Sequence, residues 1–325
     1  MNEGFKKTLC RALEAEDIEE RETLQSLWSG YGKIARYAVS GADVESVVVK
    51  LVRIPSEVDH PRGWHSNFSQ ERKIRSYEVE AAWYRGLASK CDTHCRIPAC
   101  FATAAEGSEV MIALEDLDAS GFTGRKDRAS VQEMKQCLAW LASFHARHMG
   151  QTAGGLWPKG TYWHLDTRPD ELEALSDLPL KRAAKEIDRI LDGCQFKTLL
   201  HGDAKLANFC FDEARQGVAA VDFQYVGGGC GMKDVAYFVG SCLSDTECER
   251  FESELLDAYF GFLVEALERY GSKVSGERIE SEWRPLYPVA WTDFHRFLKG
   301  WSPGHWKVHS YSERLSREVL SNLPR

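Results

Sequence analysis

The sequence of 325 residues has no apolar run close to the roughly 20 residues that a membrane span needs. Its start, MNEGFKKTLC, also lacks an apolar run of signal-peptide length. Basic residues are not in surplus: 41 Lys and Arg stand against 49 Asp and Glu, a net charge of −8, which argues against a general nucleic-acid binder. There is no internal repeat and no low-complexity tract. We therefore expect a globular cytoplasmic protein that binds neither nucleic acid nor membranes.

Ten cysteines are more than average, but we do not expect a disulfide framework. A chain of this length can bury a sizeable core in two domains or lobes and does not need covalent staples. Several cysteines lie inside apolar segments, where a free thiol behaves as a small hydrophobic side chain. The sequence therefore predicts reduced cysteines.

The first third of the chain has the pattern of β-strands, and one helix interrupts it. Short runs of β-branched and aromatic residues are separated by glycines, which is typical of strands joined by turns. Apolar residues at three- and four-residue steps predict the helix. The expected strands are 24–28, 35–39, 46–52 and 109–114, the helix is 72–88, and a loop rich in Pro, His and Ser covers 55–70.

From about residue 130 the pattern becomes helical. Ser130 followed by Glu133 predicts a capping box that opens a helix. Two short apolar runs on either side of the turn DEARQG predict a β-hairpin within this helical part. The sequence therefore predicts an α+β protein of two lobes, with residues 1–114 rich in strands and residues 115–325 mostly helical.

The densest group of polar residues is His201-Gly202-Asp203, followed by Asn208 and Asp222. Two carboxylates and an amide on the two sides of one hairpin can converge at one end of it. Asp222 follows an apolar strand, so its charge needs a partner, and Mg²⁺ takes one or two carboxylates together with substrate phosphates. Asn208 offers a carbonyl oxygen for a second ion, which leaves Asp203 able to accept a proton from a hydroxyl group.

The order H-G-D-x-x-x-x-N followed by D-F resembles the catalytic loop and metal-binding segment of protein kinases. Gly in place of Arg and Gln in place of the final Gly make it more similar to the aminoglycoside phosphotransferase and choline kinase superfamily. The stretch DFQYVGGGCGMKDVAYF most resembles the ecdysteroid-kinase-like branch. The resemblance implies a bilobal protein-kinase-like fold, with a nucleotide-binding first lobe and a second lobe that holds the catalytic loop, the metal site and the acceptor.

The resemblance also implies an activity and a set of site residues. The activity is Mg²⁺-dependent transfer of the ATP γ-phosphoryl group to a hydroxyl of a small-molecule alcohol acceptor. Asp203 would be the catalytic base, and Asn208 and Asp222 would hold Mg²⁺. His201 and Asp234 would brace the loop.

Lys50 stands inside the apolar run VVVKLV. The resemblance implies that it binds the α- and β-phosphates of the nucleotide and pairs with a glutamate on a helix; otherwise it is a lysine on an exposed strand edge. The family pattern places this glutamate four residues before an aromatic residue, which favours Glu80 ahead of Tyr84. Helical spacing alone leaves Glu78 open as well.

Further nucleotide contacts are expected from the backbone. Gly30 and Gly32 lie between two strand-like runs, where the resemblance implies that their N–H groups cover the phosphates; a plain hairpin turn would explain them equally. Glu115 and Leu117 fall where the resemblance implies a hinge whose backbone binds adenine. The choice between ATP and GTP stays open.

Four of the ten tryptophans lie between residues 283 and 306. Aromatic rings beside a carboxylate can hold a cation, and they can also stack on a flat alcohol. In the resembling enzymes the C-terminal helices form the wall of the acceptor site, so we expect acceptor contacts from this segment; ordinary helix core is the alternative. The candidate residues are Trp291, Asp293, His295 and Trp301.

Two other functions stay open at this point. One is a kinase-like protein that binds a nucleotide or ligand without turnover, although Lys50, Asp203, Asn208 and Asp222 are all present. The other, less well supported, is a protein kinase, because no A-P-E-like anchor follows Asp222. The sequence identifies neither the acceptor nor the oligomeric state.

Overall fold

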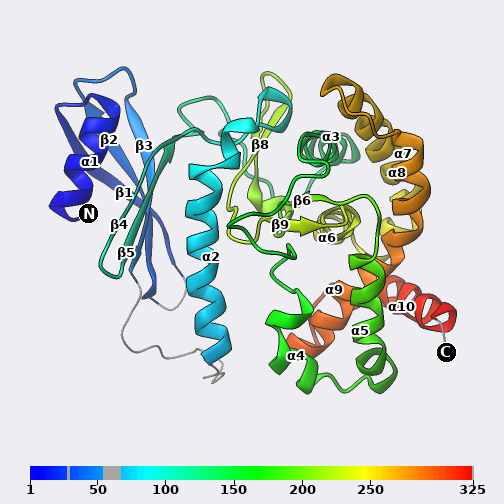
Figure 1. Cartoon of the computed structure of the whole chain (residues 1–325). Helices are drawn as coiled ribbons and strands as arrows, with labels where there is room; N and C mark the ends of the chain where they lie inside the picture. The colour runs from blue at the N-terminus through cyan, green and yellow to red at the C-terminus, as the bar shows by residue number, and fades with distance from the viewer. Residues whose placement is uncertain (28–29, 54–66, 324–325) are drawn as a thin grey trace. The chain divides into compact units, whose positions relative to one another are not determined.

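The computed structural model describes residues 1–27, 30–53 and 67–323, and the chain divides into two compact units (Figure 1). Residue 28 of the first expected strand and residues 55–66 of the expected loop lie outside the described residues. Unit 1 comprises Met1–Ser89, Ile97–Gly124 and Cys210–Val221, and unit 2 comprises Lys90–Arg96, Arg125–Phe209 and Asp222–Arg325.

Unit 1 is built on an antiparallel sheet with the strand order β1-β2-β3-β5-β4. Because successive side chains of a strand point to opposite faces, Val47 and Val49 pack on the first helix, whereas Lys50 and Val52 face the second. The elements are α1 (Glu3–Leu13), β1 (Asp17–Ser26), β2 (Gly32–Ser40), β3 (Ser46–Arg53), α2 (Asn67–Arg85), β4 (Cys100–Glu106) and β5 (Glu109–Glu115).

Three features of this unit differ from the sequence prediction. The strand β1 begins at Asp17, well before residue 24. The sequence pattern does not show its first half, because β1 is an edge strand in which only Ile18 is buried and most of the other side chains are charged or polar. Charges on an edge also discourage pairing with other chains. The strand β4 was not predicted, because it is rich in alanine and only half-buried. The helix α1 was not predicted either, although its cap and its two buried residues, Phe5 and Leu9, are helical signals.

The boundary between the units also differs from the predicted one at residue 114. The chain beyond β5 turns back on itself through a hydrogen bond from Phe122 N to Leu117 O, and Gly124 pairs with Phe211. Leu117 packs with Cys210 and Ala219 of the predicted hairpin, so the hairpin groups with unit 1. Its strands are β7 (Phe209–Asp212) and β8 (Gly217–Ala220).

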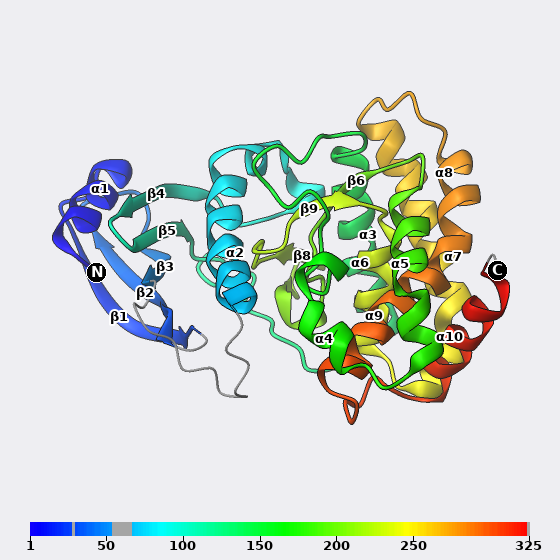
Figure 2. The same ribbon diagram turned by 60° about the horizontal axis from the view of Figure 1, so that its bottom comes forward.

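Unit 2 is mostly helical. The predicted capping box is confirmed at Ser130 and Glu133, where it opens α3. Helix α3 lies along α7, and α9 contacts α5, α6 and α10 (Figure 2). The elements are α3 (Val131–Arg147), α4 (Pro169–Ala174), α5 (Leu178–Asp192), β6 (Thr198–Leu200), β9 (Gly227–Gly229), α6 (Met232–Cys242), α7 (Asp245–Arg269), α8 (Gly276–Trp283), α9 (Tyr287–Trp301) and α10 (Ser310–Asn322).

The glycine run that forms β9 is packed tightly. It pairs with β6, and a Cβ on Gly227 would collide with the backbone of Trp157. Glycine is therefore needed here for a close approach of two backbones. All ten cysteines are free thiols, as the sequence predicts. Within the described ranges, none of the helices is long and apolar enough to cross a membrane.

Candidate active site

The loop between β6 and β7 carries Asp203, which is only 6% exposed. Tyr237 Oη donates a hydrogen bond to Asp203 Oδ1 at 2.9 Å. Lys205 Nζ donates to the other carboxylate oxygen, Oδ2, at 3.0 Å, and Asn208 Nδ2 donates to the same oxygen at 3.2 Å. Asn208 Nδ2 also donates to the backbone oxygen of Asp203 at 2.8 Å. Both oxygens of the carboxylate are thus held in one orientation.

Helix α6 holds this loop along one of its faces. Asp234, Tyr237 and Ser241 follow one another at helical spacing, so their side chains lie on the same side of the helix. Asp234 accepts hydrogen bonds from the backbone N–H groups of His201 at 2.6 Å and Gly202 at 3.0 Å. Ser241 Oγ accepts one from a backbone N–H further along the loop at 3.0 Å. One helix therefore fixes the start, the carboxylate and the end of the loop.

His201 and Asp234, predicted to brace the loop, have contacts of that kind. The backbone N–H of Asp203 donates to His201 Nδ1 at 3.2 Å. Asp234 is fully buried and lies 3.2 Å from His145 Nε2, while the other ring nitrogen of His145 lies 2.8 Å from the Tyr259 hydroxyl. A buried carboxylate with this many partners is satisfied and stays in place.

Gly202 explains why the motif has glycine in place of arginine. Its φ is +81°, a left-handed conformation that side chains disfavour, and an added Cβ would collide with the backbone oxygen of Tyr225. The loop therefore passes too close to the segment after Asp222 to carry a side chain at this position.

Asp222 follows β8 in a left-handed conformation with φ of +71°. This conformation costs a non-glycine residue on the order of 1 kcal/mol, and such strain concentrates at functional sites. Gln224 Nε2 donates to Asp222 Oδ1 at 2.6 Å. The glutamine of D-F-Q thus orients the carboxylate that the resemblance assigns to Mg²⁺.

The donor set of Asn208 and Asp222 fits Mg²⁺. The amide nitrogen of Asn208 is committed to Asp203, which leaves its carbonyl oxygen as the ligand atom. Among the described residues, no three or more His, Cys, Asp or Glu side chains gather as a metal site. One carboxylate and one amide oxygen, completed by phosphate oxygens and water, is the kind of set that Mg²⁺ accepts, whereas a structural zinc site needs four protein ligands.

Unit 1 carries the lysine–glutamate pair. Lys50 Nζ lies 2.6 Å from Glu80 Oε2, and both residues are buried. Glu78 is exposed and pairs with Arg75, so the structure selects Glu80 of the two glutamates that the sequence leaves open. A buried ion pair contributes little net stability, because desolvation offsets the attraction. The presence of the buried Lys50–Glu80 pair is better explained by a function of Lys50.

Gly30 and Gly32 have separate structural reasons to be glycine. Both have positive φ, and a Cβ on Gly32 would collide with the backbone oxygen of Leu51 on the neighbouring strand. The two glycines border a hollow of about 590 Å³ that Met1 and Phe5 also line. This hollow lies on the α1 side of the sheet, whereas Lys50 faces α2. A phosphate contact through these glycines stays a prediction.

Backbone groups of the expected hinge are partly committed within unit 1. Glu115 N donates to Ala99 O at 2.8 Å, and Leu117 O accepts from Phe122 N at 2.8 Å. The N–H of Glu115 is therefore not available to adenine without breaking a bond that this unit already makes, whereas Leu117 O keeps a second lone pair. The adenine contact at Glu115 and Leu117 stays a prediction.

The expected acceptor residues lie mostly inside unit 2. Asp293 is 1% exposed and accepts hydrogen bonds from Arg296 at 2.9 Å and Trp163 Nε1 at 3.0 Å. Although burial raises the pKa of Asp293, the charges of Lys233 and Arg296 hold it below its usual range. Asp293 therefore anchors α9 in the core.

The other three residues expected to contact the acceptor are also buried or half-buried in unit 2. Trp291 and His295 are buried, and Trp291 packs edge-to-face on Tyr311. Trp301 is half-buried and stacks on Phe297 with ring centres 5.7 Å apart. Pro288 does not disturb the helix, because it lies in the first turn of α9, where proline fits. Of the four candidates, Trp301 keeps the most exposed surface for a ligand.

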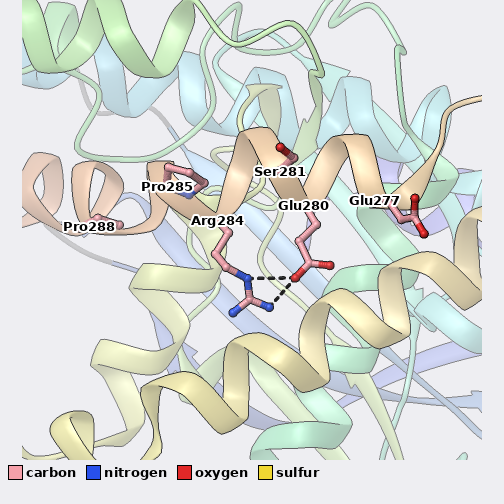
Figure 3. Close-up of a pocket in the computed structure, with 6 residues that line it drawn as sticks. All are labelled: Glu277, Glu280, Ser281, Arg284, Pro285 and Pro288. Atoms are coloured by element: carbon pink, nitrogen blue, oxygen red, sulfur yellow. Dashed lines mark hydrogen bonds and ion pairs between the residues drawn. The ribbon is translucent and has the colours of Figure 1, made fainter.

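Another hollow, of about 550 Å³, lies along α8 and the start of α9 (Figure 3). Figure 3 shows that Arg284 on its border is paired with Glu280. None of the predicted site residues lines this hollow. It contributes nothing to the candidate active site.

Sequence reasoning missed Tyr237 and Lys205, which both contact Asp203. Lys205 is two residues from Asp203 and stands within the motif itself. Tyr237 is three residues after Asp234, so helical spacing already places it on the face that braces the loop. Although burial lowers the pKa of Lys205, the charges of Asp203 and Asp222 raise it above its usual range, which keeps the ammonium charged.

Comparison with known proteins identifies the family. The profile of the phosphotransferase enzyme family matches residues 24–270, which is more than half of the chain. A search of the curated proteins found no match. Among solved structures, a microcompartment-associated aminopropanol kinase has 16% sequence identity, a TM-score of 0.50, and coverage of 98% of this chain and 94% of its own.

Two aminoglycoside phosphotransferases are also similar in structure. One is an aminoglycoside-3'-phosphotransferase of type VIII, with 16% identity, a TM-score of 0.47, and coverage of 89% of this chain and 99% of its own. The other, from Streptomyces rimosus in complex with ADP and streptomycin, has 16% identity, a TM-score of 0.43, and coverage of 78% and 90%. This chain belongs to the phosphotransferase enzyme family. The predicted family and its protein-kinase-like α+β fold are thereby confirmed.

Proposed function

We propose that this protein transfers the γ-phosphoryl group of ATP to a hydroxyl group of a small molecule, with Mg²⁺ as the metal. The observation that carries the proposal is the geometry of Asp203, a buried carboxylate held at both oxygens in the loop of a phosphotransferase. A positioned carboxylate can orient a hydroxyl group and accept its proton, which is the task of a general base. An aminopropanol kinase shares the fold, in agreement with an alcohol as acceptor.

Each unit contributes its own part of the machinery. In unit 1, Glu80 holds Lys50, whose ammonium group would bind the α- and β-phosphates of the nucleotide. In unit 2, Asn208 and Asp222 would hold Mg²⁺, which offsets the negative charge of the phosphates.

The chemical step needs little covalent work from the protein. The acceptor oxygen attacks the γ-phosphorus while its proton passes to Asp203, and the bond from the γ-phosphorus to the bridging oxygen of ADP breaks. Asp203 contributes orientation before the step and a proton site during it. The ammonium group of Lys205 donates a hydrogen bond to the same carboxylate and helps to hold it in place.

The variant Asp203→Asn tests this proposal. We expect it to bind Mg·ATP with unchanged affinity in calorimetry, and to lose about 100- to 10,000-fold in the rate of ADP release with a panel of small alcohols. Asp212→Asn is a matched control, because Asp212 is also buried but binds only backbone N–H groups of a turn and an arginine.

Full turnover in Asp203→Asn would overturn the role of the base. Binding of Mg·ATP by the unmodified protein without a product from any acceptor would instead favour a nucleotide-binding protein that does not catalyse transfer.

A further inference from the structure

The segment between α9 and α10 brings an ammonium group next to the candidate base. Lys307 Nζ lies 4.8 Å from the centre of the Tyr237 ring, 5.5 Å from that of Phe294 and 5.4 Å from that of Trp306. Tyr237 is the residue whose hydroxyl binds Asp203. Lys307 therefore covers a face of the aromatic ring that positions the base.

Lys307 has no counter-ion of its own. Its Nζ forms no ion pair with a carboxylate anywhere in the part of the chain that the structure describes. The carboxylate whose charge acts on it is Asp203, which is already bonded to Lys205. Burial lowers the pKa of Lys307 to about 8, although the charge of Asp203 raises it.

An ammonium group that is partly removed from water without a carboxylate partner is unfavourable, so a ligand that supplies a negative charge would stabilise it. The aromatic rings supply part of the compensation, since a cation is attracted to the face of an aromatic ring. A cation of the chain therefore already lies over the ring of Tyr237, whose hydroxyl group binds the base. With Lys205 on Asp203, two ammonium groups stand near the base.

We infer that the acceptor alcohol carries an anionic group, a carboxylate or a phosphate, which Lys307 binds while the hydroxyl group faces Asp203. This inference rests on the proposed phosphotransferase function and adds the charge class of its acceptor. An alcohol with an ammonium group would meet repulsion from two lysines at the same place.

A panel of small alcohols of similar size and different charge tests the inference. The probes are choline, glycerol, glycerate and glycerol 3-phosphate, each offered with Mg·ATP to the full chain while ADP release is measured. We expect turnover with glycerate or glycerol 3-phosphate to exceed that with choline and glycerol, and the comparison of the two separates a carboxylate from a phosphate.

Preference for choline or glycerol overturns the inference. So does the absence of turnover with both anionic alcohols in a protein that binds Mg·ATP. Failure to bind Mg·ATP would refute the proposed function instead.

Variants of Lys307 connect the preference to the residue. A charged hydrogen bond of ordinary strength predicts that Lys307→Met raises KM for the anionic alcohol about 10- to 100-fold, with KM for ATP unchanged. Lys307→Arg should keep the preference. Lys299→Met is the control, because Lys299 on α9 is already paired with Asp177 and Glu313. An equal effect of Lys307→Met on all four alcohols, or no effect, would overturn the role of Lys307.

Discussion

The hydroxyl group of Tyr237 offers the sharpest test of how the base is positioned. Tyr237→Phe removes the 2.9 Å hydrogen bond to Asp203 Oδ1, together with the contact of the same hydroxyl group with Tyr162. The ring remains, together with its packing on Trp163 and Phe294, whose ring centres lie 4.8 and 4.9 Å away. The variant therefore changes the orientation of the carboxylate with little change in the core.

The structure sets the size of the expected effect. A hydrogen bond to a charged group contributes about 1.5–3 kcal/mol, and each 1.36 kcal/mol is a factor of about ten in rate. Because Lys205 and Asn208 still hold the other oxygen, we expect kcat to fall about 10- to 100-fold. KM for ATP should stay within about twofold, because Tyr237 contacts the base in unit 2, whereas the lysine pair belongs to unit 1.

The assay is steady-state ADP release with the best alcohol of the panel, together with thermal unfolding. Tyr37→Phe is a matched control, since buried Tyr37 also donates a 2.9 Å hydrogen bond to a carboxylate, that of Glu20 in the sheet of unit 1. It should affect stability alone. An unchanged kcat in Tyr237→Phe, or an equal loss in Tyr37→Phe, would refute the positioning role.

Two further predictions concern the loop and the pH dependence of stability. Gly202→Ala should abolish ADP release and lower Tm by several degrees, because the added Cβ would collide with Tyr225 O. Gly150→Ala is the control and should keep activity, because Gly150 has a similar φ of +72° and no neighbour within 4 Å. An active Gly202→Ala would contradict the packing argument. Burial lowers the pKa of His148 to about 3 and that of His295 to about 4, from 6.5. The unfolded chain therefore binds more protons between pH 6.5 and 4, and the free energy of unfolding should fall on acidification by up to about 1.4 kcal/mol per pH unit for each histidine. Urea unfolding across this window measures the slope; His295→Gln should flatten it, and a flat profile for the unmodified protein would contradict the prediction.

The sequence predicts the order of the main elements because local patterns determine them. The apolar run around Lys50 and the capping box at Ser130 are strong signals, and both elements form where expected. The strands β1 and β4 carry weak signals, because an edge strand with charged or alanine-rich faces lacks clear alternation. The assignment of the hairpin to unit 1 depends on contacts between distant segments, such as Leu117 with Ala219, which no local pattern contains.

The candidate site divides in the same way. Asp203, Asn208 and Asp222 stand out because their spacing is unusual and their charges need partners. The choice of Glu80 over Glu78 needed the structure, since only Glu80 reaches Lys50.

The C-terminal aromatic segment carried no signal to separate core from ligand contacts. Most of it proves to be core, and Asp293 anchors its helix. Lys307 could not be predicted, because its neighbours come from α6 and α9. The ecdysteroid-kinase-like branch and the cytoplasmic location stay predictions, and the choice between ATP and GTP stays open.

The proposed transfer depends on binding of a Mg²⁺–nucleotide complex through Asp222. The most direct measurement is thermal unfolding with ATP, with and without Mg²⁺, for the unmodified protein and Asp222→Ala. A ligand at about 100 times its Kd stabilises the folded state by about 2.7 kcal/mol, which raises Tm by several degrees. The account predicts this shift only with Mg²⁺ and only in the unmodified protein. No shift with Mg·ATP, or an equal shift in Asp222→Ala, would contradict it.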